Sequence, residues 1–443
     1  MRANPEASSS PNVFASARRV VFQAGALTLA ALATLAYKAE SANLDRAMAD
    51  GNQVYVSNDH PEMCGDIDIS HLDTSPLHTE GRYIKNEKDE TVRINGISVY
   101  GGLQQPNYDE EFVKERVDAQ IIAGAKYWNA KWIRLQLSQD LWRQDPARFT
   151  AELDRQVKLI TSLNTGVILN NQNEFTDFNT SAPTDLSIDF IKFLQKRYGC
   201  LGGKEIVDVF NETRFHMPGK NNLTYSQAYL DLWLKGGNYH GKRFVGQQAL
   251  VNAAESISDN LVEVEGLGVA TTFQGVKPNT VSDPKHKVVF ALHHPHISDQ
   301  GVQNWGPAFL DLAEKKPVVL GEYQYYPANR QECLKNPGGY RNIPKLIWLW
   351  KQLDGVVFWG LQPNVMVRWR YPTAITDEVV DFGPQRAEGL NAPGTMLPAN
   401  PGPDFCQKDR GGIGAYEKEY LAEEAIHNPS TSTTRQSVSF TRP

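Results

Sequence analysis

Residues 206–212, Ile-Val-Asp-Val-Phe-Asn-Glu, show the pattern on which the prediction of the fold rests. A short run of β-branched and aromatic residues, typical of a buried strand, ends here in an amide and a carboxylate. Residues 317–322, Pro-Val-Val-Leu-Gly-Glu, repeat the pattern with a second carboxylate after a second apolar run. Outward from these two segments, short apolar runs alternate with amphipathic stretches, which is the pattern of βα units around a parallel sheet.

Eight strands are expected from this alternation. They are predicted at 97–100, 132–137, 167–170, 206–210, 261–264, 288–292, 318–320 and 356–359. Helices are predicted at 110–123, 149–163, 186–198, 225–234, 247–256, 308–313 and 343–353. A doubly wound sheet would place a glycine-rich turn directly before a helix after its first strand, whereas Gly101-Gly102 lead into a loop. The sequence therefore predicts an α/β fold of the (β/α)8 TIM-barrel type.

The barrel is expected to span residues 82–427, with further segments on either side. Arg18 and Arg19 precede an apolar run at 20–36, so residues 1–45 are predicted to be a signal peptide or a membrane anchor followed by a linker. Residues 46–81 form an N-terminal extension that leads to a short hairpin at 83–94. The Ser/Thr-rich stretch 428–443 is predicted to be a disordered tail. The protein is thus expected to be secreted or extracellular, with anchoring to the membrane through residues 20–36 as the alternative to cleavage.

Composition excludes some classes of function. The net charge of −6 offers no basic face for nucleic acid, and 41% hydrophobic residues suffice for a large core. Four cysteines without metal-site spacing leave either one or two disulfides or buried thiols open. No metal and no cofactor is expected, and the protein is predicted to be a monomer. The Pro/Gly-rich segment 362–414 would form a rim or lid at the end of the barrel where strands terminate.

The two strand-end carboxylates, Glu212 and Glu322, suggest the chemistry. Residues just beyond the carboxyl ends of barrel strands face the active site of such folds. Hydrolysis of a glycosidic bond needs one carboxylic acid to protonate the leaving oxygen and one carboxylate to attack the anomeric carbon or activate water. Each glutamate alone could be a salt-bridge partner, but the pair after the fourth and seventh strands favours glycoside hydrolysis.

With these residues, the chain resembles glycoside hydrolase family 5, the cellulase family, within the retaining glycosidases of clan A. Asn211-Glu212 and Gly321-Glu322 match the family motifs after strands four and seven. The resemblance implies that Glu212 is the acid/base, Glu322 the nucleophile and Asn211 a ligand of the sugar 2-hydroxyl. It also implies that Arg134 keeps the nucleophile ionised and that Trp359 forms the floor of the sugar subsite. A structural ion pair for Arg134 and core packing for Trp359 are the alternatives.

The sequence departs from the family in two places. The family usually carries His-x-Tyr after strand six, and aligning His294 with this histidine puts His296 where the tyrosine stands; a shift of one residue would select His293 instead. The family histidine after strand three is also absent, so Gln172 is predicted to take over sugar binding. Nearby Glu174 is a further carboxylate without an assigned role.

The sequence favours one of three functions. The favoured one is a retaining glycosidase that cleaves O-glycosidic bonds in a β-linked polysaccharide or β-glycoside, such as a β-glucan or mannan. The alternative is a non-catalytic carbohydrate-binding barrel at the cell surface. An aldolase or lyase would need a strand-end lysine or a phosphate site, and no predicted strand ends in such a lysine.

Overall fold

The computed structural model describes residues 67–127, 130–172, 180–215, 226–293, 305–323 and 353–358. The predicted leader at 1–45, the rim segment 362–414 and the tail 428–443 lie outside these residues. The domain boundary at 427/428 therefore remains a prediction, and so does the boundary at 81/82, which no observation tests. Among the described helices, none is long and apolar enough to cross a membrane. Cys200 is disulfide-bonded, and the other three cysteines lie outside the described residues.

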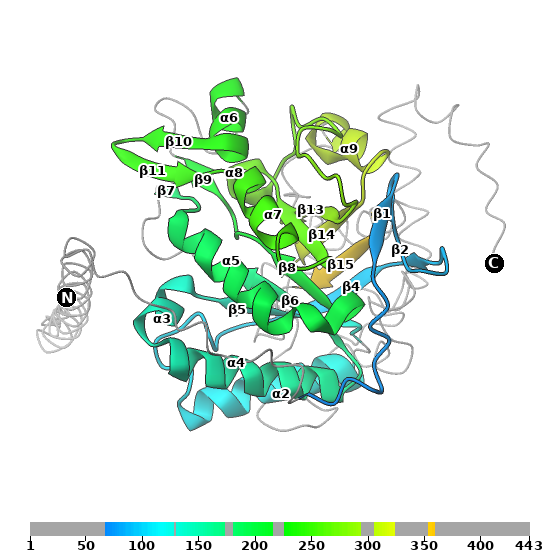
Figure 1. The fold of residues 1–443 in the computed structure, drawn as a ribbon, viewed down its shortest axis with the longest axis vertical. Coiled ribbons are helices and arrows are strands. Elements are labelled where there is room, and N and C mark those ends of the chain that lie inside the picture. The colour runs from blue at the N-terminus through cyan, green and yellow to red at the C-terminus, as the bar shows by residue number, and fades with distance from the viewer. Residues whose placement is uncertain are drawn as a thin grey trace, which may run out of the picture. The chain divides into compact units, whose positions relative to one another are not determined.

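Eight parallel strands close into a barrel in the order β12-β13-β14-β15-β4-β5-β6-β8 (Figure 1). The strands are β4 (Ile94–Val99), β5 (Trp132–Leu137), β6 (Gly166–Asn171), β8 (Glu205–Asp208), β12 (Leu261–Glu265), β13 (Val288–His293), β14 (Val318–Tyr323) and β15 (Gly355–Phe358). Each of the eight predicted strands overlaps one of these. The predicted (β/α)8 barrel is thereby confirmed.

Alternation along the strands separates the barrel interior from the layer that faces the helices. Ile168, Ile206 and Leu261 belong to the inner apolar cluster, whereas Val167, Val207 and Val262, their neighbours in sequence, belong to the cluster shared with the helices. This period of two is the geometry of a strand with both faces buried.

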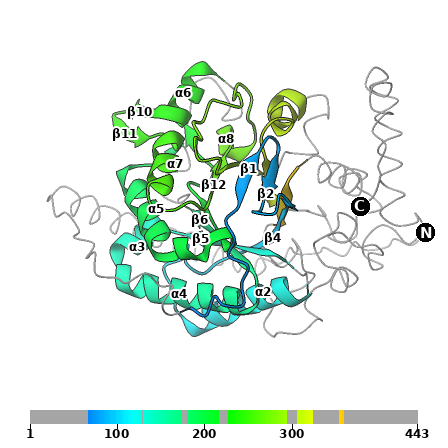
Figure 2. The same cartoon turned by 45° about the vertical axis from the view of Figure 1, so that its right-hand side comes forward.

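Helices lie against the outer face of strands β4, β5, β6, β8 and β12 (Figure 2). The described helices are α2 (Glu111–Tyr127), α3 (Gln139–Gln144), α4 (Pro146–Ser162), α5 (Asp185–Tyr198), α6 (Gln227–Lys235), α7 (Gln247–Glu255), α8 (Leu267–Ala270) and α9 (Asp311–Ala313). Helix α4 shows how the local sequence forms such a helix. The Asp145 side chain accepts the Arg148 N–H, Pro146 occupies the first turn, and Phe149 and Leu153 are buried on the inner face. Such capping and an apolar stripe are what an α-helix on a barrel needs.

A three-stranded antiparallel sheet closes the amino-terminal end of the barrel. It consists of β1 (His78–Glu80), β2 (Tyr83–Lys85) and β3 (Thr91–Val92), and confirms the predicted hairpin. Leu77 and Ile84 are buried in the inner cluster beside Trp132 of the barrel. Gly166 makes room for that indole, since a Cβ there would lie 2.6 Å from Trp132 Cε3. One end of the barrel is therefore filled with apolar side chains, which leaves polar groups to the carboxyl ends of the strands.

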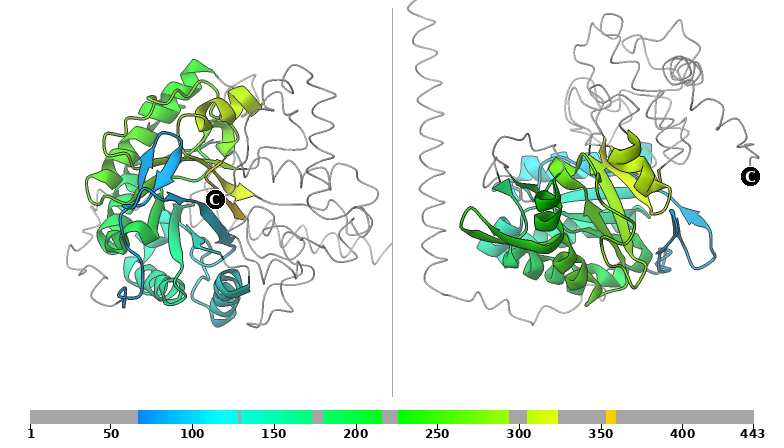
Figure 3. Two further views of the ribbon diagram at one scale, coloured as in Figure 1. Left: turned by 90° about the vertical axis from the view of Figure 1, so that its right-hand side faces the viewer. Right: turned by 90° about the horizontal axis from the view of Figure 1, so that it is seen from above.

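Short strands and helical turns lie in the segments between the barrel strands. Strand β7 (Thr180–Ser181) pairs with β9 (Arg214–Phe215), and β10 (Gly236–Tyr239) pairs with β11 (Lys242–Val245). The β10–β11 hairpin projects away from the barrel strands (Figure 3). A 3₁₀ segment, η2 (Gly199–Lys204), precedes β8. The predicted helix at 308–313 is a wide π-type turn, η4 (Gly306–Leu310), that runs into α9. Most of the helix predicted at 343–353 lies outside the described residues.

Candidate active site

Seven of the described polar side chains lie inside the barrel toward the carboxyl ends of its strands, and each is at most 2% exposed. They come from six strands, at positions whose side chains point into the barrel. They are Arg134, Asn170, Asp208, Glu263, Glu265, His293 and Glu322. Burying so many charged groups is costly unless they are paired with one another, because each loses its hydration. Their contacts therefore define what the site can do.

Arg134, on β5, is the centre of this network. Its Nη1 donates to Glu322 Oε1. Its Nη2 donates to Asp208 Oδ2 at 2.9 Å, to Asn211 Oδ1 at 2.9 Å and to Glu265 Oε1 at 3.0 Å. The planar guanidinium offers five donors in a fixed fork, which suits it to hold several carboxylates in one arrangement. Arg134 thus orients Glu322 and fixes the Asn211 amide.

Glu322 reaches the interior through an irregularity in β14. Leu320 pairs with Leu292, but the next pairing joins Glu322 to His293, so Gly321 is an extra residue between them. Such a bulge turns the following side chain relative to a regular strand, and bulges are common next to active sites. Burial raises the pKa of Glu322, while His293 and Arg134 act to lower it. These two cations favour the ionised carboxylate.

Glu212 follows β8 and is less deeply buried, since 18% of its side chain is exposed. Its Oε1 lies 3.2 Å from Nδ1 of His293. One oxygen of Glu212 and one of Glu322 lie within 4.8 Å of each other. The backbone of Glu212 has φ +47°, a left-handed conformation that is uncommon outside glycine and that occurs in turns and at active sites.

His293 connects the carboxylates. Its Nε2 lies 3.1 Å from Glu265 Oε1, and its Nδ1 lies 3.6 Å from Glu322 Oε2. Burial acts to lower the pKa of His293, but the carboxylates of Glu265 and Glu322 outweigh it and raise the pKa well above its ordinary value. An imidazolium donates from both ring nitrogens and so fits a position between carboxylates.

Two further acids lie deeper in the barrel. Asp208 accepts from Arg134 and, at 2.8 Å, from Asn170 Nδ2. Among the described residues, no hydrogen-bond donor contacts either oxygen of Glu263. Burial and the nearby charge of Asp208 raise the pKa of Glu263 to about 8. Glu263 therefore keeps its proton at neutral pH, which relieves repulsion in a cluster with more carboxylates than cations.

The structure brings together four of the site residues predicted from the sequence, namely Glu212, Glu322, Arg134 and Asn211. Gln172, also predicted, follows β6 and is buried. Among the described residues, neither polar atom of its side chain has a hydrogen-bond partner. The predictions for His294 and Trp359 lie outside the described residues, as do Glu174 and His296. His293, which the sequence offers under a shift of one residue, lies in the cluster.

Glu265, Glu263, Asp208 and Asn170 were not singled out from the sequence. The signal was present in the segment Leu-Val-Glu-Val-Glu at Leu261–Glu265. Carboxylates two residues apart in an otherwise apolar strand must point to the same face, and in a barrel that face is the interior. Asp208 shows the same signal within β8.

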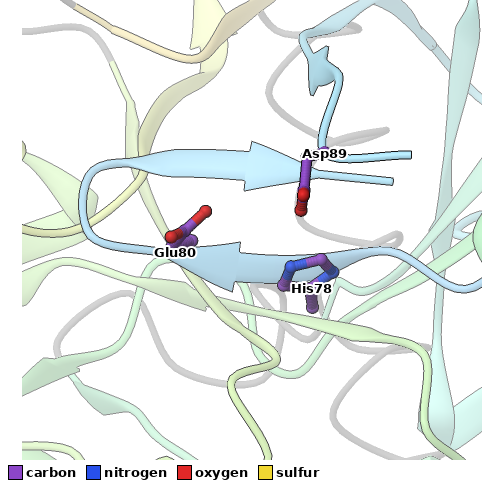
Figure 4. Close-up of side chains that lie close together, drawn as sticks. All are labelled: His78, Glu80 and Asp89. Atoms are coloured by element: carbon purple, nitrogen blue, oxygen red, sulfur yellow. The ribbon is translucent and has the colours of Figure 1, made fainter. Parts of the chain in front are cut away.

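Among the described residues, two side-chain groups have the composition of a cation site. One is Glu212, His293 and Glu322, but a metal ion there would have to compete with the Arg134 guanidinium for Glu322. The other is His78, Glu80 and Asp89 on the small sheet (Figure 4). Two of its three members are exposed, and exposed acidic groups commonly gather without an ion. We assign no metal site to either group.

The architecture defines a class: (β/α)8 barrels with an acid–base cluster at the carboxyl ends of the strands. No family model matches the chain, and no curated protein matches its sequence. Its structure is similar to that of a β-glucanase from Saccharophagus degradans in complex with cellotetraose, with a TM-score of 0.50, 16% identity, and coverage of 72% of this chain and 94% of that chain.

It is also similar to the catalytic domain of the major endoglucanase from Xanthomonas campestris pv. campestris. The TM-score is 0.50 at 13% identity, and the match covers 78% of this chain and 99% of that chain. The chain therefore shares the barrel fold of these enzymes, in agreement with the fold that the resemblance to the cellulase family implies.

Proposed function

We propose that the protein is a retaining glycoside hydrolase. The observation that carries the proposal is the pair Glu212 and Glu322, whose nearest oxygens lie within 4.8 Å at the carboxyl ends of two barrel strands. Retaining glycosidases hold their carboxyl groups about 5–5.5 Å apart, whereas inverting enzymes need about 6.5–9.5 Å to admit a water molecule. The short separation supports direct attack by one carboxylate.

Glu322 is the nucleophile in this proposal. It is the more buried of the two carboxylates, and the guanidinium of Arg134 favours its ionised form. Its oxygen attacks the anomeric carbon, and the bond from that carbon to the leaving oxygen breaks. Glu212 donates its proton to the leaving oxygen, so the first step yields an ester between the sugar and Glu322.

Glu212 then acts as the base. Water attacks the anomeric carbon of the ester and gives a proton to the Glu212 carboxylate, which releases the sugar and restores Glu322. The partial exposure of Glu212 suits this role, because the group must meet both the leaving group and water. Two inversions at one carbon leave the anomeric configuration of the substrate unchanged.

We propose a β-linked glucan as the substrate class, with mannan as the second choice. The support is the fold shared with the β-glucanase and the endoglucanase named above. Asn211, Gln172, His294 and Trp359 are proposed to bind the sugar. Export, based on the apolar run at 20–36, is likewise proposed from the sequence.

The test is hydrolysis of a panel of soluble β-glucans, mannans and chromogenic β-glycosides by wild type and Glu322→Ala. Glu205→Gln is the matched control, because Glu205 is also a buried barrel carboxylate but lies at the opposite end of its strand. Turnover by wild type and the control, with at least a thousandfold loss in Glu322→Ala, is expected. Sugar binding by all three proteins without turnover would instead identify a carbohydrate-binding barrel.

A further inference from the structure

We propose that Glu265, the last residue of β12, is a positioning residue. It fixes the acid/base Glu212 relative to Arg134, which binds the nucleophile. This inference rests on the proposed function. The side chain of Glu265 contacts Arg134, His293 and the backbone N–H of Glu212, so it acts through the groups it binds. It is fully buried, and three of its contacts lead to different parts of the site.

The first contact fixes the backbone of Glu212. The N–H of Glu212 donates to Glu265 Oε2. This N–H belongs to a residue with φ +47°, a conformation that costs free energy and persists only when surrounding contacts impose it. A charge-assisted hydrogen bond at that amide is well suited to impose it. Glu265 thereby sets the direction in which the Glu212 side chain leaves the strand end.

The second and third contacts are made by the other oxygen. Oε1 of Glu265 lies 3.0 Å from Nη2 of Arg134 and 3.1 Å from Nε2 of His293. Arg134 binds Glu322, and His293 binds Glu212. One carboxylate therefore connects the groups that hold the nucleophile with the groups that hold the acid/base.

The charges around Glu265 support an acid–base pairing with His293. Facing the pair are Arg134 from β5, Asp208 from β8, Glu212 after β8, Glu263 from β12 and Glu322 from β14. Burial raises the pKa of Glu265 well above its ordinary value, and the pKa of His293 is raised too. The two groups therefore hold a shared proton to higher pH than an isolated imidazole would. With that proton on His293, Glu265 is the carboxylate that accepts from Arg134 and from the Glu212 N–H.

The test compares Glu265→Gln with wild type and Glu205→Gln. The amide keeps the shape of Glu265, but only one of its two terminal atoms accepts hydrogen bonds, and it carries no charge. We expect kcat to fall at least tenfold with KM within twofold, because the groups that bind sugar are unchanged. The pKa of His293, followed by NMR, should fall because its strongest carboxylate partner is lost. Glu205→Gln should change neither quantity.

Several results would overturn the inference. A folded Glu265→Gln enzyme with kcat within twofold of wild type would do so, as would a loss of kcat without a fall in the pKa of His293. If the variant does not fold, titration of His293 in the wild-type protein tests whether Glu265 holds the imidazolium. An imidazole that loses its proton at or below the ordinary value of about 6.5 would show that Glu265 does not hold it. A wild-type protein without any turnover would contradict the proposed function itself, which is a separate outcome.

Discussion

Nδ1 of His293 lies 3.2 Å from Oε1 of Glu212, although the two residues are 81 positions apart in the chain. The imidazole is fully buried. Glu322 lies beside the same nitrogen, with Oε2 at 3.6 Å, and Glu265 faces Nε2. The imidazolium can direct one N–H to Glu212 and the other to Glu265, whereas a neutral ring has a single N–H and can donate to only one of them. Its protonation state therefore links the pH of the solution to the geometry of the site.

Replacing His293 should change the response of activity to pH. Because the pKa of His293 is raised, wild type keeps its imidazolium at neutral pH and loses it only as pH rises through that raised value. We expect His293→Phe to lower kcat about 10- to 100-fold. The variant should also lack the part of the fall in kcat at high pH that is caused by loss of the His293 proton. The measurement is kcat from about pH 5 to about pH 9. An unchanged profile with unchanged kcat would exclude this role.

Removing Arg134 should destabilise the fold as well as abolish activity. Arg134→Met would leave Asp208, Glu265 and Glu322 in a buried site without their shared cation. Breaking a buried ion pair by removing one partner costs about 3–5 kcal/mol. Urea denaturation at neutral pH should show a loss of this size. At low pH, where the carboxyls are protonated, the difference in the free energy of unfolding between wild type and the variant should become smaller. A difference that does not depend on pH would contradict the ion pairing.

Glu205 should make stability depend on pH. It is buried at the start of β8, and burial raises its pKa to about 8 although Asn260 and Gln195 donate hydrogen bonds to it. In the unfolded chain the carboxyl titrates near 4.5. Between these values only the unfolded state releases the proton, so this contribution to stability is complete below about pH 4.5 and lost as pH rises toward 8.

The matched experiment is denaturation of wild type and Glu205→Gln at several pH values across that window. All other titrating groups are common to both proteins, so the difference between their free energies of unfolding isolates Glu205. We expect wild type to lose on the order of a few kcal/mol more than the variant between the two ends of the window. If the free energies of unfolding of the two proteins change with pH in parallel, Glu205 titrates alike in the folded and unfolded states.

The strands were predictable from the sequence because both faces of each are buried, which leaves short apolar runs that are easily distinguished from amphipathic helices. Helix bounds were less accurate. The helix predicted from residue 149 begins at Pro146, where Asp145 caps it, and the helix predicted to end at 123 continues to Tyr127. These ends depend on capping and packing that hydrophobic periodicity does not record.

In the site, Glu212, Glu322 and Arg134 could be predicted because each stands at or near the end of an apolar run. The bulge at Gly321 could not, since it depends on pairing with the neighbouring strand. Glu265 was missed because the fifth strand was predicted to end at residue 264, one residue short of the carboxylate. The choice between His293 and His294 turned on a register that only tertiary packing sets.

The configuration of the first sugar released tests the central claim most directly, namely that Glu322 attacks the anomeric carbon while Glu212 supplies and removes the proton. Proton NMR can follow the anomeric signals of a β-linked substrate during the first minutes of hydrolysis, before the product mutarotates. The β-anomer should appear first, because two displacements restore the original configuration. Appearance of the α-anomer first would mean that water attacks directly, and would contradict Glu322 as the nucleophile.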